Sequence, residues 1–282
     1  MILSLTIRNC IITIFLIIVI VFLILNINIT YSENFVGDFK PRLNIHEDRY
    51  PTIFNPGHQN AIVTLYTPNI ATYAQHSIQN IKKYCKMHNL TLYIFNQPLS
   101  DEIKHGCWNK IPAILYMFNK TEHKYIIWMD SDAVFNRLDI SFDKFINKYA
   151  NKDLIVCRDI RDEKYKFNSG IMIFKNTAWS KKIIEDTWNS TIPHGYRGEG
   201  DQVVLKDQIL ADGKKDNNYE ENSGHKKVAL LSEREFNSFP RNEKHRNLGP
   251  DTINDFIIHF MGHSTEDRIK YMSEINKKLE NQ

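Results

Sequence analysis

Cysteine is scarce in this sequence of 282 residues, which contains 4. Cys10 lies inside an apolar N-terminal run, which leaves Cys85, Cys107 and Cys157. In an oxidising compartment these thiols permit one disulfide and leave one thiol over, and no pairing follows from the sequence. Their spacing is unlike that of zinc ligands, so a structural zinc site is excluded.

An excess of charge of one sign is also missing. The formal net charge is +3, and Lys is interspersed with Asp and Glu rather than gathered in blocks, as on an ordinary solvated surface. Basic and aromatic residues form no ladder, which argues against a nucleic acid as partner. The sequence does contain 42% hydrophobic and 12% aromatic residues, which is enough for a packed core and excludes wholesale disorder.

The N-terminus is the most apolar part of the chain. No charged residue occurs from Cys10 to Leu25, and the run is long enough to cross a bilayer. A cleaved signal peptide is the alternative, but no small-x-small cleavage pattern follows, so we expect an uncleaved signal anchor. Arg8 precedes the run and the next cation is Lys40, which predicts that everything beyond the anchor lies outside or in a lumen.

This pattern predicts a type II, single-pass membrane protein with four parts. We expect a short cytoplasmic tail (1–9), a transmembrane anchor (10–29), a polar stem (30–60) and a catalytic domain (61–282). Luminal topology would also expose N-glycosylation sequons. These begin at Asn28, Asn89, Asn119 and Asn189.

Beyond the stem, short apolar runs alternate with helical patterns. Strands are expected at 61–66, 90–95, 124–129, 153–157, 170–174 and 255–260, and helices at 72–89, 108–118 and 177–189. This alternation predicts an α/β fold with a mainly parallel sheet. The polar segment 211–227 is expected to be an exposed loop, and 265–279 an amphipathic helix that packs on the domain.

Two carboxylates follow the expected strand 124–129, in the sequence Asp130-Ser131-Asp132. Ligands of open α/β sheets bind at the carboxyl ends of strands, and alternation along an extended chain puts both side chains on one side. Such hard oxygen ligands suit Mg²⁺ or Mn²⁺ shared with a substrate diphosphate. The alternative is a turn with solvated carboxylates.

Three functions remain open on these residues alone. A haloacid-dehalogenase-like phosphohydrolase would use Asp130 as nucleophile, but its second metal motif fails: Gly200 and Asp201 are present, whereas Leu205 replaces the second acid. Its nucleophile strand is normally the first of the domain, and this one follows two others. A non-catalytic luminal carbohydrate-binding protein is a further alternative, and a nucleotide-sugar transferase is the third.

Eight segments between Ile62 and His263 decide among these alternatives. In order they are "IVTLYTPN", "SIQNIKKYCKMHNLTLY", "CWNKIPAILYMF", "YIIWMDSDAVF", "FNSGIMIFKNTAWS", "GEGDQVVL", "REFNSFP" and "IIHFMGH". Together they resemble glycosyltransferase family 34, the retaining galactosyl-, mannosyl- and xylosyltransferases of the fungal Golgi and of plant xyloglucan synthesis. The resemblance implies a GT-A (Rossmann-like) fold, with a mainly parallel mixed sheet flanked by helices. It also implies a UDP- or GDP-sugar donor and transfer of a hexose or pentose to a glycan or glycoprotein acceptor. The domain would be luminal in a Golgi- or ER-type compartment, or at a host membrane if the protein is viral.

The same resemblance implies roles for individual residues. It assigns a Mn²⁺ ion, or Mg²⁺, to Asp130, Asp132 and His259, although His259 could also be a core histidine. It implies that Asn168, Asp201 and Gln202 contact the transferred sugar. Asp201 and Gln202 could instead cap a helix. Nucleotide-sugar contacts are assigned to Thr64, Tyr66, Lys110, Asp130, Ser131, Gly262 and His263.

The chain departs from the family pattern after Gly262. Family members commonly have Cys at the next position and plant members then a Lys, whereas this chain has His263 and Ser264. The plant-type phosphate cation is therefore missing unless His263 or Lys110 replaces it. The acceptor loops differ most within the family, so the acceptor sugar cannot be read from the sequence.

Overall fold

The computed structural model describes residues 46, 48–101, 105–159, 167–190, 200–215, 217–240 and 254–281, all within a compact unit that spans Leu43–Gln282. The expected tail and anchor, and the stem up to residue 45, lie outside these residues. Within the described ranges, no helix combines the length and apolar character that a membrane span needs. The three cysteines there, Cys85, Cys107 and Cys157, are all free thiols.

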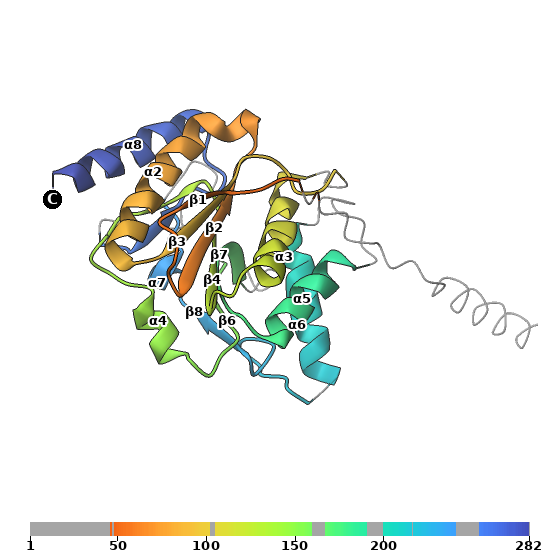
Figure 1. Cartoon of the computed structure of the whole chain (residues 1–282). Coiled ribbons are helices and arrows are strands. Elements are labelled where there is room, and N and C mark those ends of the chain that lie inside the picture. The colour runs from red at the N-terminus through yellow and green to blue at the C-terminus, as the bar shows by residue number, and fades with distance from the viewer. Residues whose placement is uncertain are drawn as a thin grey trace, which may run out of the picture. The chain divides into compact units, whose positions relative to one another are not determined.

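A mixed seven-stranded sheet forms the centre of the fold (Figure 1). Its strand order is β1-β3-β2-β4-β7-β6-β8. Strands β2, β3, β4, β6 and β8 run in one direction, while β1 and β7 run in the other. The strands are β1 (Thr52–Phe54), β2 (Asn60–Leu65), β3 (Thr91–Phe95), β4 (Tyr125–Met129), β6 (Leu154–Arg158), β7 (Phe167–Lys175) and β8 (Val228–Leu231).

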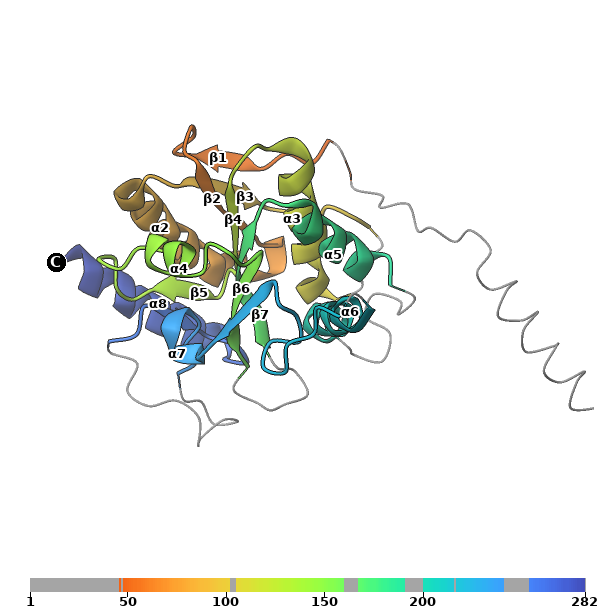
Figure 2. The same ribbon diagram turned by 90° about the horizontal axis from the view of Figure 1, so that it is seen from below.

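Helices cover both faces of this sheet (Figures 1 and 2). Helices α3 (Lys110–Lys120), α5 (Ala178–Trp188) and α6 (Asp201–Lys215) pack on one face, where Ile126 and Trp128 of β4 join their core. Helices α2 (Ala71–His88), α4 (Asp143–Lys148) and α7 (Glu233–Phe236) pack on the other, where Ile127 and Met129 join. Alternate residues of β4 therefore enter two cores, which explains why this strand is apolar throughout.

A second, two-stranded sheet lies beyond the end of β4. Strand β5 (Ala133–Phe135) pairs antiparallel with β9 (Ile257–His259), and helix α8 (Thr265–Glu280) follows and packs against α2. Two short 3₁₀ helices, η1 (Pro68–Ile70) and η2 (Gly106–Asn109), precede α2 and α3.

The predicted strands and helices of the α/β pattern are confirmed, with shifts of a few residues at their ends. Strands β1, β5 and β8 were not predicted. Because β1 pairs with β3, the sheet includes Thr52–Phe54, which belong to the expected stem.

The prediction of an exposed loop over 211–227 is wrong in part. Helix α6 continues to Lys215, and the following segment folds back on it, with the His225 Nε2 atom 3.3 Å from the Asp212 Oδ2 atom. Gly213 permits this return, because a Cβ atom there would lie 2.4 Å from the Gly224 carbonyl oxygen.

Candidate active site

A pocket of about 300 Å³ opens at the carboxyl end of β4. Predicted site residues from α3, the turn after β4, β7, α6, β9 and the segment after β9 line it together. They are Lys110, Asp130, Asp132, Asn168, Asp201, Gln202, His259 and Gly262. The structure therefore brings together residues that are scattered over most of the domain sequence.

Four other predicted nucleotide-sugar residues are not among its lining residues. Thr64 is buried within β2, Tyr66 packs against the core on the α2 side, and Ser131 is buried in the turn after β4. His263 lies against the rings of Phe260 and Tyr271.

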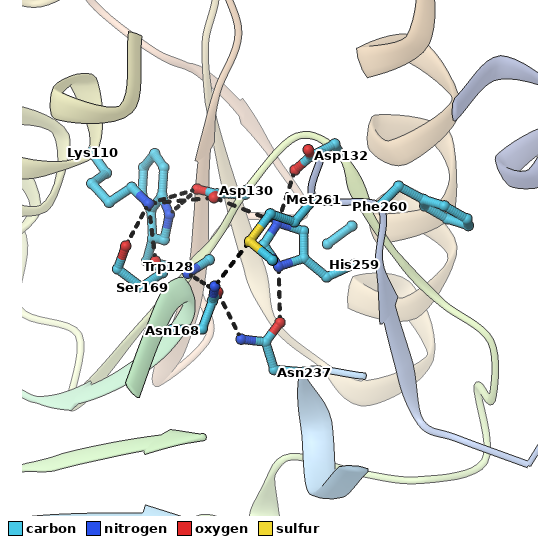
Figure 3. Close-up of polar contacts among 12 residues, drawn as sticks. Lys110, Trp128, Asp130, Asp132, Asn168, Ser169, Asn237, His259, Phe260 and Met261 are labelled. Atoms are coloured by element: carbon cyan, nitrogen blue, oxygen red, sulfur yellow. Dashed lines mark hydrogen bonds and ion pairs between the residues drawn. The ribbon is translucent and has the colours of Figure 1, made fainter. Parts of the chain in front are cut away.

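Asp130, Asp132 and His259 form a potential metal-binding cluster (Figure 3). The chain turns sharply after β4, since the Ala133 N–H donates to the Asp130 carbonyl at 3.1 Å. Strand β5 then pairs Ala133 with His259, which sets the imidazole opposite both carboxylates. The His259 Nε2 atom is 3.1 Å from Asp132 Oδ1 and 3.8 Å from Asp130 Oδ2. One ligand atom from each residue lies within 4.8 Å of the others.

Gly170 makes room for this histidine. A Cβ atom at Gly170 would lie 2.2 Å from His259 Cε1, closer than packed atoms approach, so a larger residue would displace the imidazole. The Gly170 carbonyl also accepts from the Asp130 N–H at 2.8 Å. The Asn-Ser-Gly segment of β7 thus supports two of the three cluster residues.

The charges of the cluster suit a divalent cation. Three carboxylates, of Asp130, Asp132 and Asp201, face two fixed cations, Lys110 and Arg268, which leaves net negative charge. Burial raises the pKa of Asp130, against the attraction of Lys110 and His259. Burial acts in the same sense on Asp132, but His259 and Arg268 outweigh it and hold the pKa of that carboxyl below its ordinary value. Two carboxylates and an imidazole are a ligand set that Mn²⁺ accepts.

Lys110 lies between the carboxylates of Asp130 and Asp201. Its side chain is only 4% exposed, and Nζ lies 3.2 Å from Asp130 Oδ1 and 3.4 Å from Asp201 Oδ2. It also donates to the Ser169 carbonyl and hydroxyl at 3.1 and 3.0 Å. Burial lowers the pKa of Lys110, but the two carboxylates outweigh burial and raise it. Lys110 is therefore a buried residue of the site and not a surface cation of its helix.

Replacing Lys110 with methionine is expected to lower the free energy of unfolding by about 3–5 kcal/mol, because removing one partner of a buried ion pair leaves the other charge uncompensated. Denaturant unfolding in EDTA measures this, with Lys86→Met on the exposed surface of α2 as control. If Lys110→Met unfolds at the wild-type denaturant concentration, Lys110 does not hold these carboxylates together.

Asp201 and Gln202 begin α6 and are anchored to β7. The Ser169 hydroxyl donates to Asp201 Oδ2 at 2.7 Å, and the Ser169 N–H donates to Gln202 Oε1 at 2.9 Å. Gln202 Nε2 and Asn168 Nδ2 both donate to Asp159 Oδ2, at 3.0 and 3.1 Å. As the first residue of α6, Asp201 remains compatible with a capping role as well.

Among the residues that contact the cluster, Arg268 and Asn237 were not predicted from the sequence. Arg268 of α8 binds Asp132 at 2.9 Å, donates from Nε to the Phe260 carbonyl at 3.2 Å and lies 4.8 Å from the Tyr73 ring centroid. Asn237 contacts His259 at 3.0 Å. Arg268 belongs to a helix that the sequence marked only as amphipathic. Asn237 lies in the segment "REFNSFP", whose resemblance to the family could have identified it as a site residue.

Comparisons with known proteins agree with this geometry. Residues 57–167 match the model of the galactosyl transferase GMA12/MNN10 family, glycosyltransferase family 34. Xyloglucan 6-xylosyltransferase 4 of Arabidopsis thaliana is 31% identical over 44% of this chain and 24% of its own length. Xyloglucan 6-xylosyltransferase 2 of the same plant is 28% identical over 62% of this chain and 36% of its own length. The chain thus spans about a third or less of the length of these relatives.

Solved structures show the same fold at low sequence identity. A glycosyltransferase involved in glycosylation of the major capsid of PBCV-1 superposes with a TM-score of 0.61 at 15% identity, over 76% of this chain and 98% of its own. The galactosyltransferase LgtC, solved with donor and acceptor sugar analogues, gives 0.50 at 13% identity, over 77% and 95%. The fold is therefore that of GT-A glycosyltransferases, and the match over residues 57–167 supports the assignment of the chain to glycosyltransferase family 34.

Proposed function

We propose that this protein is a metal-dependent, retaining glycosyltransferase that moves a hexose or pentose from a UDP- or GDP-sugar to a glycan acceptor. The observation that carries the proposal is the convergence of Asp130, Asp132 and His259 beside Asp201 in one pocket. A diphosphate needs a cation at one end of such a site, and a sugar needs polar side chains at the other. The pocket offers both.

Asp130, Asp132 and His259 would hold the metal, and Mn²⁺ suits their mixed oxygen and nitrogen atoms better than Mg²⁺. An ion held there would supply positive charge to the departing diphosphate. The third protein ligand, His259, is held by β9 rather than by a loop, so little reorganisation is needed before a donor binds.

Arg268 supplies the phosphate cation that the sequence lacks after Gly262. Lys110 is enclosed by two carboxylates, and His263 packs against Phe260. Arg268 instead lines the pocket beside Asp132, and its guanidinium can share its N–H groups between that carboxylate and a phosphate.

Arg268→Ala is expected to weaken nucleoside diphosphate binding about tenfold, since one charge-assisted hydrogen bond contributes roughly 1.5–3 kcal/mol and some of that is recovered by solvent. Titration calorimetry with the diphosphate and Mn²⁺ measures this. Arg137→Ala, which removes an exposed arginine paired with Asp139, is the control. If Arg268→Ala binds the nucleoside diphosphate as tightly as the wild type, Arg268 does not supply the phosphate cation.

Asp201, Asn168 and Gln202 act on the sugar. In the retaining reaction the bond from the anomeric carbon to the phosphate oxygen breaks, and the acceptor oxygen bonds to the same face. The acceptor proton passes to the departing phosphate oxygen, so positioning and electrostatics dominate. The Asp201 carboxylate stabilises the positive charge that develops at the anomeric carbon.

Donor screening tests this function. The purified full-length chain is incubated with Mn²⁺ and each UDP- or GDP-sugar, and nucleotide release is followed with a panel of oligosaccharide acceptors. UDP-xylose and UDP-galactose come first, because relatives are named xylosyltransferases and the family is described as galactosyl transferase. Release of phosphate from a phosphomonoester, with no donor accepted, would instead favour the phosphohydrolase. In this chain, Leu205 occupies the position of that enzyme's second acid, and it is fully buried.

We also propose that residues 10–29 anchor the protein and leave the domain in a lumen. Protease added to intact microsomes should then spare the chain beyond residue 31, and endoglycosidase should lower its mass. Asn89, Asn119 and Asn189 are exposed, so their side chains are accessible to modification. A soluble protein that begins near residue 30 would contradict the anchor.

A further inference from the structure

Asn237 is a buried amide between the potential metal cluster and the sugar side of the pocket (Figure 3). It follows α7 directly, and its side chain is 0% exposed. Its Oδ1 atom lies 3.0 Å from His259 Nδ1, and its Nδ2 atom donates to Asn168 Oδ1 at 3.0 Å. The Asn237 amide thus joins the imidazole of His259 in β9 to the side chain of Asn168 in β7.

The direction of these hydrogen bonds is determined at the Asn168 end. The Gly170 backbone N–H, which can only donate, lies 2.8 Å from Asn168 Oδ1. Asp159 Oδ2, which also accepts from Gln202 Nε2, lies 3.1 Å from Asn168 Nδ2 and accepts from it. Asn168 Oδ1 is therefore an acceptor, which requires the Nδ2 group of Asn237 to face it.

Orientation of Asn237 then determines the proton on His259. With Nδ2 turned to Asn168, the Oδ1 atom of Asn237 faces the imidazole and accepts from its Nδ1–H group. Nδ1 therefore carries a proton, and when that is the only proton of the ring, the lone pair is on Nε2, where an ion would bind. Nε2 is the atom that faces Asp130 and Asp132.

We propose that Asn237 is a positioning residue for the metal centre: together with Asn168 and Asp159 it keeps the Nδ1 proton on His259 and so presents the Nε2 lone pair to the ion. The metal itself rests on the proposed function, whereas the location of the proton does not. The absence of a Cβ at Gly170 leaves room for the imidazole in this orientation, and the Phe239 ring packs beside it, 5.6 Å between centroids.

The hydrogen bonds from His259 through Asn237 and Asn168 end at Asp159. Asp159 also accepts from Gln202, so the same network joins the proposed metal ligand to the proposed sugar contacts. A change at Asn237 therefore acts on metal affinity through His259. Partners of this kind typically contribute 10–100-fold to metal affinity.

The first experiment determines which ring nitrogen of His259 carries the proton, in the full-length protein labelled at histidine. Nitrogen-15 NMR of the wild type, without metal and with Zn²⁺ as a diamagnetic probe, is expected to show His259 Nδ1 protonated in both states and the Nε2 resonance shifted by the ion. An unprotonated Nδ1, or a metal-dependent shift at Nδ1 instead of Nε2, overturns the proposal. This measurement needs no variant and no enzymatic activity.

Variants at Asn237 give the second experiment. Asn237→Leu removes the acceptor and should weaken Mn²⁺ binding 10–100-fold in calorimetry without nucleotide. Asn237→Asp retains an acceptor toward His259, so it should keep the Nδ1 proton and near wild-type Mn²⁺ affinity, although it loses stability beside Asn168 Oδ1. Ser238→Ala is the control, because its buried hydroxyl has no hydrogen-bond partner among the described residues.

The outcomes separate this inference from the proposed function. Wild-type Mn²⁺ affinity in Asn237→Leu contradicts the positioning role. Equal losses in Asn237→Leu and Asn237→Asp, with the Nδ1 proton unchanged in both, also contradict it, since they indicate a purely structural effect. If the wild type binds no Mn²⁺, the proposed metal dependence fails while the wild-type NMR spectrum still decides where the proton is.

Discussion

Asp132→Ala and His259→Ala are each expected to abolish Mn²⁺-dependent nucleotide binding and to lower turnover by at least about two orders of magnitude. Loss of one preorganised charged group at a developing charge typically costs 10²–10³ in rate. Asp132 contacts both His259 and Arg268, so its removal also frees two of the groups that would face the diphosphate. The loss should appear in turnover as well as in binding, because charge on the diphosphate grows as the bond breaks.

Calorimetry with the nucleoside diphosphate and steady-state donor turnover measure these effects. Asp139→Asn, an exposed carboxylate paired with Arg137, is the matched control and should retain wild-type turnover. Circular dichroism checks that each variant keeps its fold. Full activity of the wild type in EDTA would refute the metal assignment.

Asp201→Asn is expected to lower turnover by about two orders of magnitude or more and to leave nucleoside diphosphate affinity nearly unchanged. The substitution retains size and hydrogen-bonding capacity but removes the charge that stabilises an oxocarbenium-like transition state. The diphosphate lacks the sugar that Asp201 serves, so its affinity should not respond. Asp201 is only 2% exposed, which strengthens its electrostatic effect on a neighbouring group.

The capping alternative makes a different forecast for the same variant. Asn caps a helix about as well as Asp, so under that alternative stability and turnover would both stay near wild type. Asp207→Asn, an exposed carboxylate of the same helix α6, controls for a general effect of lost charge. A silent Asp201→Asn would move Asp201 to a structural role, and Glu199, which lies outside the described residues, would be tested next.

Local patterns in the sequence were sufficient for much of the fold. The apolar run 124–129 was predicted to be a strand, and β4 is buried throughout. The carboxylates after it were predicted to lie at a ligand site, and they line the pocket. Such patterns are readable because strand periodicity and the transition from apolar to acidic residues involve only neighbours in the chain.

The mixed direction of the sheet was less readable. Strand β7 runs antiparallel to both β4 and β6, whereas a strand-helix alternation favours parallel pairing. Burial on both faces makes β7 apolar in either direction, so its hydrophobicity carries no information about which way it runs. Pairing partners that are distant in sequence decide it.

The sequence by itself therefore determined most of the α/β elements, the acidic end of β4 and, by resemblance, the identity of the potential metal ligands. Only the tertiary structure decided how those ligands are held: the β5–β9 pairing that brings in His259, the burial of Lys110 between two carboxylates, and the contacts of Arg268 and Asn237. The physical reason is that each of these depends on a contact between segments far apart in the chain, and an isolated arginine or asparagine shows no local periodicity that would reveal its partner.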